Sequence, residues 1–329
     1  MVEVSVIIIN LNTRQLLEGC LRSVVADGDQ TLEIIVIDNG STDGSAEMVQ
    51  SKFPRVRLVK NEHNQRFAKP NNEGMKMATG KYLFLLNSDT IVNRGAIHSL
   101  TSFLDAHPDA AACGPMLLYP DGRLQKSVKG FPTLWTHLCD MFFLDKLFPD
   151  TRLIGRGDQA YFDYERTQEV DHVMAAAFLV RRQVFSTIGG FDERFSIYYN
   201  DMDWCYRIKM NGWKIYYVHD ATVIHYLGQT MGSLNRDFSY FEEQFNNTMF
   251  FYQKHYGRGS VVVFKLLLSV GFTLRAAGWS LAWLVRRTDQ SKIMTRFSWK
   301  ALALGSRFWI PLPSIYSRDE HTEKNLVEV

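Results

Sequence analysis

Residues 4–9 read VSVIII, a short and almost unbroken run of apolar, mostly β-branched side chains. Such a run is typical of a strand that is buried on both faces of a parallel sheet. The stretches EIIVI at 33–37 and YLFLL at 82–86 have the same character, and a shorter apolar stretch lies at 56–59. The first part of the chain therefore predicts a sheet of buried strands.

Segments with helical spacing separate these strands. Apolar side chains recur at helical spacing over 13–26, where Thr13 can cap the helix start, and further helices are expected to open at 41–43 and to span about 71–78. Strands that alternate with helices predict an α/β fold, with a Rossmann-like, doubly wound and mostly parallel sheet flanked by helices. We expect this domain to occupy residues 1–235.

The pattern becomes less regular in the middle of the chain. Residues 115–169 are rich in Pro, Gly, Asp and aromatic residues, which predicts loops over the site where a substrate binds. Beyond them we expect a strand at 173–180, a helix through Arg207 and a strand at 214–218.

Composition and charge exclude several classes of protein. With 329 residues, of which 46% are hydrophobic, the chain can bury one large core or two modest ones, so it is not disordered throughout. Lys plus Arg number 37 against 35 Asp plus Glu, a net charge of +2, so nucleic acid is not an expected partner. The four cysteines have no CxxC spacing, which favours reduced core thiols in the cytoplasm, and the N-terminal residues do not resemble a signal peptide.

Polar residues follow three of the predicted strands, at the point where each strand ends. Asn10 and Asn12 follow the first, Asp38 follows the second, and Asn87-Ser88-Asp89 follow the strand that begins at Tyr82. Because ligands bind at the carboxyl ends of strands in open α/β sheets, these residues predict a nucleotide-binding edge. Asp38 can accept a hydrogen bond from the N3–H of a pyrimidine base, and Asp89 can hold Mg²⁺ or Mn²⁺ against a diphosphate. Each acid could instead belong to an ordinary turn or helix cap.

Two further candidate sites lie later in the chain. Asp201 and Asp203 are surrounded by aromatic residues in YYNDMDW, where reduced solvation can raise the pKa of a carboxyl group toward the range of a general base. The alternative is a pair of helix N-terminal acids that complement the helix dipole, which suits Asp203 best. His219 and His225 flank a strand end and can bind an ion such as Mn²⁺, although a lone histidine is more often structural.

Five blocks of sequence follow one another in a specific order: VSVIIINLN, DNGSTDGS, NQRFAKPNNEGMKMATGKYLFLLNSDT, GGFDERFSIYYNDMDWCYR and HDATVIH. Together they resemble the family 2 inverting glycosyltransferases, especially the bacterial rhamnosyltransferase-like branch, over roughly residues 3–230. The resemblance implies a GT-A fold and an enzyme that transfers a sugar, with inversion, from a nucleotide diphosphate sugar such as dTDP-rhamnose or a UDP-sugar. The implied acceptor is a glycan or lipid-linked glycan in cell-envelope polysaccharide biosynthesis.

The resemblance also implies roles for individual residues. Asp201 matches the catalytic base, whereas Asp89 and His225 match the site of a divalent cation, Mg²⁺ or Mn²⁺. Asp38 matches the residue that binds the uracil or thymine base. We further expect the nucleotide sugar to be bound by Asn10, Asn12, Asn64, Arg66, Asn72, Asn87 and Ser88, and the acceptor to be faced by Asp203 and Trp204.

Four positions depart from the family pattern. Asn87 and Asn200 stand where acids are usual, and Arg66 and Pro70 stand where glycine is frequent. These departures leave open a catalytically degenerate protein that only binds a nucleotide sugar or acts as a scaffold. A nucleotidyltransferase is the rival enzyme class, but no glycine- and lysine-rich triphosphate loop follows Ile9.

Residues 236–329 are expected to form a C-terminal helical extension. The apolar run at 261–285 is long enough to cross a bilayer, although Lys265 and Arg275 interrupt it. Aromatic and basic residues favour peripheral attachment to the inner face of the cell membrane, and these are Trp279, Trp283, Arg286, Arg287, Lys292, Arg296, Trp299 and Lys300. A membrane span, a buried helical bundle and an interface between copies of the chain are the alternatives.

Overall fold

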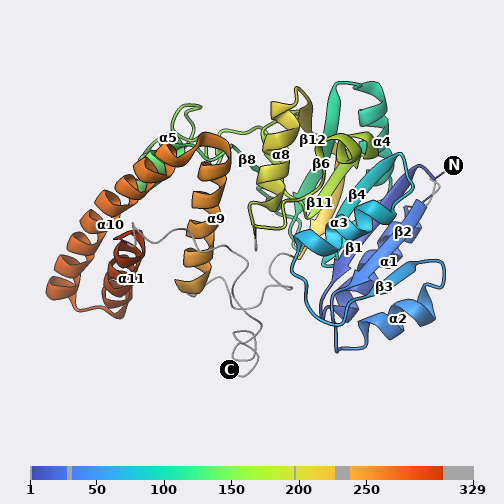
Figure 1. The fold of residues 1–329 in the computed structure, drawn as a ribbon, viewed down its shortest axis with the longest axis horizontal. Helices are drawn as coiled ribbons and strands as arrows, with labels where there is room; N and C mark the ends of the chain where they lie inside the picture. The colour runs from blue at the N-terminus through green and yellow to red at the C-terminus, as the bar shows by residue number, and fades with distance from the viewer. Residues whose placement is uncertain (1, 28–31, 196–197, 227–237, 307–329) are drawn as a thin grey trace.

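A ten-stranded sheet lies to one side of the C-terminal helices in the computed structural model, which describes residues 2–27, 32–195, 198–226 and 238–306 (Figure 1). Its main strands, in spatial order, are β3 (Arg57–Lys60), β2 (Leu32–Asp38), β1 (Val4–Asn10), β4 (Tyr82–Asn87), β11 (Ala177–Arg181), β6 (Ala110–Leu118), β12 (Lys214–His225) and β5 (Thr90–Val92). Two short strands pair at its side, β7 (Leu124–Gln125) with β6 and β9 (Gln168–Val170) with β12.

The sheet is mostly parallel, as the sequence predicts. β3, β2, β1 and β4 pair in parallel, and β6 pairs in parallel with β12. β11 lies between these two groups and is antiparallel to both β4 and β6. All the main strands except β11 and the short edge strand β5 therefore run in one direction, so their carboxyl ends lie along the same edge.

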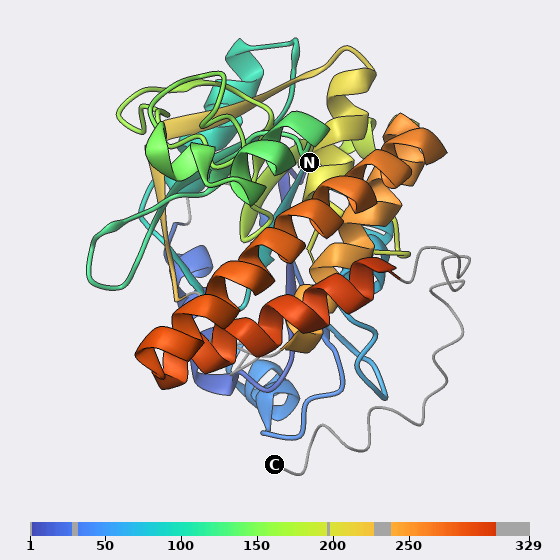
Figure 2. The same cartoon turned by 90° about the vertical axis from the view of Figure 1, so that its left-hand side faces the viewer.

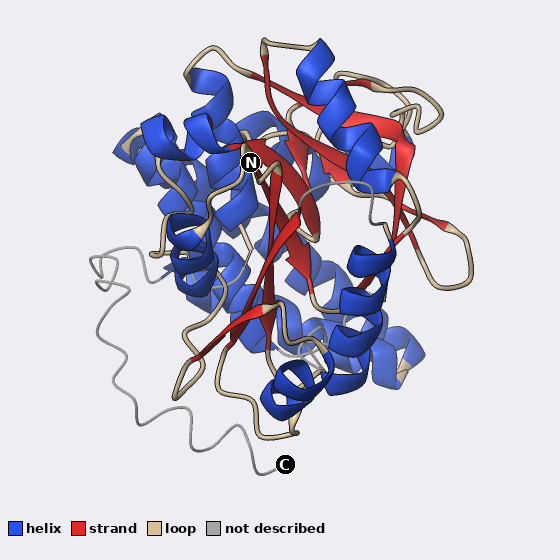
Figure 3. Cartoon of the chain, turned by 90° about the vertical axis from the view of Figure 1, so that its right-hand side faces the viewer, coloured by secondary structure: helices blue, strands red, loops and turns tan. Residues whose placement is uncertain are grey.

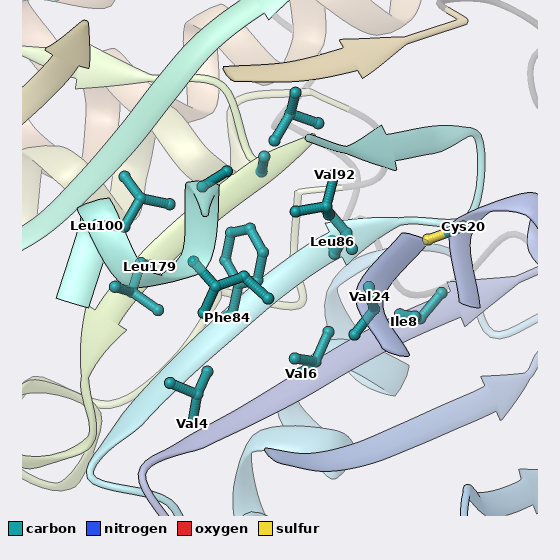
Figure 4. Packing of buried hydrophobic residues seen from close by; sticks show 14 of the residues in the cluster. Val4, Val6, Ile8, Cys20, Val24, Phe84, Leu86, Val92, Leu100 and Leu179 are labelled. Carbon is teal, nitrogen blue, oxygen red and sulfur yellow. The ribbon is translucent and has the colours of Figure 1, made fainter. Parts of the chain in front are cut away.

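Helices cover both faces of the sheet (Figure 3). Alternate side chains of β1 point to opposite faces, so Val4, Val6 and Ile8 join one hydrophobic core while Ile7 joins the other. The first core, part of which appears in Figure 4, contains residues of α1 (Arg14–Ala26), α2 (Ser45–Lys52) and α4 (Ala96–Ala106). The second contains residues of α3 (Ala68–Met77), α7 (Arg182–Ile188) and α8 (Asn200–Met210). Burial on both faces is the reason that these strands read as continuous apolar runs.

Several helix boundaries differ from the sequence prediction. α2 begins at Ser45 rather than at 41–43, because residues 41–43 form hydrogen bonds with the end of β2, the loop after β1 and the first residue of α1. Thr13 precedes α1 but does not cap it, because its hydroxyl hydrogen-bonds the side chain of Asn10 instead.

The middle of the chain contains more regular structure than predicted. The expected loops at 115–169 include the end of β6, the short strands β7 and β8 (Val128–Lys129), and the helices α5 (Leu134–Met141) and α6 (Leu144–Leu147). The strand expected at 173–180 is divided into β10 (His172–Val173), which pairs with β8, and β11. The four cysteines are buried and free, which confirms the prediction of core thiols.

Three helices form the C-terminal extension that the sequence predicts: α9 (Phe238–Tyr256), α10 (Arg258–Arg286) and α11 (Asp289–Ser306). Figure 2 shows α10 and α11 side by side in opposite directions. These helices share a third hydrophobic core with α5, which includes Met141, Tyr252, Phe264 and Leu268. The predicted boundary between 235 and 236 lies outside the described residues.

A buried cluster of charges joins the extension to the rest of the fold. Asp203 on α8 has no exposed surface, and its carboxylate binds Arg207 of the same helix at 2.8 Å. The other carboxylate oxygen contacts two residues of α9, Lys254 at 2.6 Å and His255 at 2.7 Å. Burial alone would raise the pKa of Asp203, but these three partners lower it, so the carboxylate stays ionised.

We therefore predict that Asp203→Asn lowers the melting temperature strongly. Removal of one partner from a buried charge cluster leaves the opposite charges uncompensated, which typically costs about 3–5 kcal/mol. Thermal unfolding followed by circular dichroism measures the effect. Asp121→Asn is the matched control, because Asp121 pairs with Arg123 on the exposed surface, where an ion pair contributes little to stability. Equal melting temperatures for the two variants would contradict a structural role for the cluster.

Candidate active site

The polar residues at the ends of three strands lie beside one another. In the register of the sheet, Asn10 of β1 pairs with Asp38 of β2, and Ile9 pairs with Asn87 of β4. The predicted edge is therefore present, with β1 between the strands that supply the two candidate acids. The loops that follow these strands make up the site.

A chain of hydrogen bonds connects these strand ends. Asn10 donates to Asp38 Oδ1 at 3.0 Å, and its own Oδ1 accepts from Thr13 at 2.7 Å. The Thr13 hydroxyl lies 2.9 Å from that of Ser88. Asn10 has no exposed surface. Its position suits it to orient Asp38 rather than to contact a ligand, which changes the role predicted for it.

The turn after β2 completes the surroundings of Asp38. Its second carboxylate oxygen accepts from the backbone N–H of Ser41 at 3.1 Å, and Asn12 Oδ1 accepts from the N–H of Thr42 at 2.8 Å. Gly40 has a φ of +88°, and a Cβ there would lie 2.9 Å from the backbone of His63. Each oxygen of Asp38 keeps a lone pair for a ligand, since a carboxylate can accept about four hydrogen bonds.

The loop around Asn64 and Arg66 is held by Asn39. The Asn39 amide donates to Asn64 Oδ1 and to the carbonyl of Arg66, both at 2.9 Å. Arg66 has a φ of 65°, the left-handed region in which a bulky residue is strained and glycine is favoured. Its side chain is exposed. Asn39, which follows Asp38, therefore fixes the loop that carries two predicted donor-binding residues.

Asn72 does not fit its predicted role in nucleotide-sugar binding. It is buried, and its amide group binds the backbone N–H and carbonyl of Phe191, both at 2.9 Å, and the Glu193 carboxylate at 2.9 Å. These contacts use its donors and one acceptor position, so Asn72 connects α3 to the segment before α8.

Asp89 and His225 lie together, as predicted, although they are far apart in sequence. β5 and β12 bring the His225 imidazole Nε2 to 3.4 Å from Asp89 Oδ1, and both side chains are buried. His225 Nδ1 lies 2.9 Å from Gln125 Oε1. When Nδ1 donates to this oxygen, the lone pair of Nε2 faces Asp89. Asn87 Nδ2 lies 3.5 Å from the same nitrogen.

This pair fits a divalent cation that is shared with a diphosphate. Within the described ranges, no group of three or more His, Cys, Asp or Glu side chains could hold a metal ion by itself. Mg²⁺ and Mn²⁺ commonly bind through one or two protein ligands and complete their coordination with phosphate oxygens and water. The orientation of a ligating histidine by a second residue, here Gln125, is usual in metal sites.

Asp201 lies next to the Asn87 segment and is partly accessible, with 21% of its side chain exposed. Its Oδ2 accepts from the N–H of Ala175 at 3.1 Å, while the carbonyl of Ala176 accepts from the N–H of Asn87 at 2.9 Å. Two adjacent residues thus link Asp201 to the end of β4. Both amide atoms of the neighbouring Asn200 are buried without a hydrogen-bond partner among the described residues.

The predicted rise in the pKa of Asp201 is wrong. Burial by itself would raise this pKa, but His172 and the backbone N–H groups of Ala175 and Met202 together lower it. His172 Nε2 lies 3.3 Å from Asp201 Oδ2. The carboxyl group is therefore ionised and able to accept a proton.

Asp203 and Trp204 do not face an acceptor, contrary to expectation. Both are fully buried. The indole ring of Trp204 packs against Phe178 and Phe191, and its Nε1–H donates to the carbonyl of Gly189 at 2.8 Å. Trp204 therefore belongs to the hydrophobic core and Asp203 to the buried charge cluster.

The sequence prediction missed three residues of the site: Thr13, Gln125 and His172. Thr13 had a simpler interpretation as a helix cap, Gln125 lies in a stretch without periodicity, and His172 is a single histidine at a strand start. Thr13 and Gln125 contact partners that are 75 and 100 positions away in the chain. No local pattern could have indicated these contacts.

Comparison with known proteins identifies the family. The model of the family Glycosyl transferase family 2 matches residues 5–189, which is more than half of the chain. The chain belongs to glycosyl transferase family 2. It is 26% identical, over 66% of its own length and 73% of the relative's, to an N-acetylglucosaminyl-diphospho-decaprenol L-rhamnosyltransferase of Mycobacterium tuberculosis. It is 28% identical to an O-antigen biosynthesis protein of Myxococcus xanthus, over 59% of this chain and 15% of that protein.

Solved structures show that this family 2 glycosyltransferase has the GT-A fold. A mannosyltransferase from Pyrobaculum calidifontis, in complex with GDP-Man and Mn²⁺, matches 93% of this chain and 86% of its own with a TM-score of 0.54 and 16% identity. Residues 1–349 of S. aureus TarS, in complex with UDP-GlcNAc, match 92% of this chain and 81% of their own with a TM-score of 0.52 and 17% identity.

We predict that Gln125→Leu weakens divalent cation binding about 10-fold or more, because the loss of a residue that orients a metal ligand typically has this effect. A titration with Mn²⁺ in the presence of a nucleoside diphosphate, followed by electron paramagnetic resonance, measures the affinity. Gln183→Leu on the exposed side of α7 should bind Mn²⁺ as the unaltered protein does. An unchanged affinity for Gln125→Leu would show that His225 needs no orienting partner or is not a ligand.

Proposed function

We propose that the enzyme transfers a sugar from a nucleotide diphosphate sugar to a glycan or lipid-linked glycan, with inversion, in cell-envelope polysaccharide biosynthesis. dTDP-rhamnose is the first candidate donor and a UDP-sugar is the second. The names of the mycobacterial and Myxococcus relatives support the sugar, the lipid-linked acceptor and the polysaccharide. The position of Asp201 is the observation that carries the reaction type.

Asp201 suits a single displacement at the anomeric carbon. It is ionised and partly exposed, and the contacts of Ala175 and Ala176 hold it next to the strand end that leads to Asp89. A carboxylate in this position can remove the proton of an acceptor hydroxyl, which then attacks the anomeric carbon opposite the leaving diphosphate. The Asn200 amide beside it is buried without a hydrogen-bond partner among the described residues, and an unsatisfied buried amide costs about 1–3 kcal/mol.

The donor would lie along the edge formed by β2, β1 and β4. Asp38 is proposed to accept from the N3–H of uracil or thymine, with Asn12, Ser88 and the Asn64–Arg66 loop around the nucleotide. Asp89 and His225 would hold Mg²⁺ or Mn²⁺. When bound, this cation offsets the charge that develops on the leaving diphosphate.

Asp201→Asn should abolish transfer and leave donor binding nearly intact. Asparagine keeps the shape of the side chain but cannot accept a proton at neutral pH, and loss of a general base typically lowers the rate by roughly 10²–10⁴-fold. Release of nucleoside diphosphate from a panel of nucleotide sugars, with Mg²⁺ or Mn²⁺, measures turnover, and a thermal shift measures binding. Wild-type turnover in Asp201→Asn would assign the base elsewhere. A protein that binds donors but never releases the diphosphate would be a degenerate binding protein.

We further propose that the C-terminal helices attach the enzyme to the inner face of the cell membrane. Within the described ranges, one helix, α10, is long and apolar enough to cross a bilayer. One face of α10 packs in the third hydrophobic core through Phe264, Leu268 and Phe272. This packing supports peripheral attachment. If α10 crossed the bilayer, α9 and α11, which pack against it in the same core, would enter the hydrocarbon region as well.

The outward face of α10 has the character of a membrane surface. Exposed apolar residues recur at helical spacings along it, and they are Val263, Leu266, Val270, Leu274, Leu281 and Leu284. Phe142 and Phe143 extend this surface across a groove of about 460 Å³, in which Arg275 lies over the Phe143 ring at 4.3 Å. Arg286 and Arg287 are exposed at the C-terminal end of the same helix. An apolar area bordered by cationic groups matches the interface of an anionic membrane.

The double variant Leu281→Glu/Leu284→Glu should bind anionic vesicles at least about 100-fold more weakly, since burial of each leucine side chain contributes about 1.5–3 kcal/mol. Vesicle co-sedimentation measures the bound fraction. Val25→Glu/Met210→Glu adds the same charge at exposed apolar positions on α1 and α8 and should bind normally. If neither double variant differs from the unaltered protein, α10 is not the membrane surface. Resistance of membrane-bound protein to alkaline extraction would instead indicate a span.

A further inference from the structure

His172 is a buried histidine that faces the proposed base. It lies on β10, only 4% of its surface is exposed, and Nε2 is 3.3 Å from Asp201 Oδ2. The contact is not aligned as a hydrogen bond, and neither ring nitrogen has a hydrogen-bond partner among the described residues. A buried imidazole without partners is unfavourable unless another interaction compensates for it. The nearby carboxylate is the group that can do so.

The other contacts of Asp201 show which oxygen has room for a substrate. Oδ2 accepts from the N–H of Ala175 and faces His172, whereas Oδ1 accepts from the N–H of Met202 at 2.9 Å. Since each carboxylate oxygen can accept about two hydrogen bonds, Oδ1 keeps one open position. Among the described residues, the side chain of His172 forms the ion-pair contact with this carboxylate.

We propose that His172 is a positioning residue for Asp201: its Nε2–H holds Oδ2, so that Oδ1 points toward the acceptor hydroxyl. This inference rests on the proposed function of Asp201 as the base. Catalytic hydrogen bonds are often long in a free enzyme and shorten in the complex, which accounts for the unaligned 3.3 Å contact.

The proton and electron balance of the step is simple. The acceptor O–H bond breaks, and its proton moves to Asp201 Oδ1. The electron pair left on the acceptor oxygen forms the new bond to the anomeric carbon, while the bond from this carbon to the diphosphate breaks and its electron pair leaves with the nucleoside diphosphate. His172 exchanges no proton and acts only through the orientation and charge of Asp201.

Of the ionisable groups near this pair, Lys129 on β8 lies opposite His172 in the strand register, and it is exposed. Cys205 on α8 is close enough to interact with Asp201, but burial raises the pKa of its thiol and keeps it neutral. Asp171 precedes His172 and pairs with Lys209 at 3.6 Å. Burial raises the pKa of Asp201 and His172 opposes this effect, so removal of the imidazole should let the carboxyl group take up a proton at a higher pH.

His172→Phe and His172→Gln test the role of the imidazole. Phenylalanine keeps a ring but has no hydrogen-bond donor, whereas the amide of glutamine can place a donor near the position of Nε2.

We expect His172→Phe to lower kcat by about 10- to 100-fold, a part of the roughly 10²–10⁴-fold contribution of a general base. The KM for the nucleotide sugar should stay unchanged. In the plot of kcat against pH, the loss of activity on the acidic side should begin at a higher pH. His172→Gln should regain most of the lost kcat. His98→Phe on the exposed side of α4 is the matched control and should behave as the unaltered enzyme.

A second measurement does not depend on turnover. In protein labelled with ¹⁵N-histidine, nuclear magnetic resonance can detect the Nε2 nitrogen of His172, whose signal is identified by its absence in His172→Phe. The chemical shift of this signal should change in Asp201→Asn. If this signal shifts but the unaltered protein transfers no sugar, His172 and Asp201 do interact, whereas the proposed function is wrong. Normal kcat and an unchanged acidic side of the plot in His172→Phe would overturn the inference, as would equal losses in the Phe and Gln variants or an unshifted signal in Asp201→Asn.

Discussion

The hydrogen-bonded register of β1 with β2 and β4 is the constraint on which the site depends. It places Asn10 beside Asp38 and sets the end of β4 one position back, at Asn87. Both faces of β1 are buried, so a slip by one residue would exchange the side chains between the two cores. The hydrophobic cores therefore fix not only the fold but also the relative positions of the groups proposed to bind base and diphosphate.

Buried polar groups around Asp38 have hydrogen-bond partners within the protein, whereas some of those around Asp201, where a substrate is proposed to bind, lack them within the described ranges. The network of Asn10, Thr13 and Ser88 satisfies buried polar groups and keeps Asp38 in one orientation. By contrast, Asn200 and His172 have buried polar atoms without hydrogen-bond partners in the part of the chain that the structure describes. Such atoms lower stability, and their location around Asp201 is typical of a site prepared for a ligand.

The C-terminal helices are joined to helix α8 through charge as well as apolar packing. Asp203 is two residues from Asp201 on α8, and it binds Lys254 and His255 of α9. Helix α9 in turn packs against α10, whose outer face is apolar. A proposed membrane surface and a proposed catalytic base are thus connected by one helix and one buried charge cluster.

The sequence by itself determined the α/β class, the parallel strands, the strand-end acids and the helical extension, because periodicity and turn chemistry are local properties of the chain. It also indicated Asp89 with His225, but only through resemblance to a family. Tertiary structure decided which polar residues are buried: it placed Asp203 and Trp204 in the interior, lowered the pKa of Asp201, and brought Gln125 and His172 to their partners. Burial and long-range contacts depend on how distant segments pack, and for that reason no local pattern could reveal them.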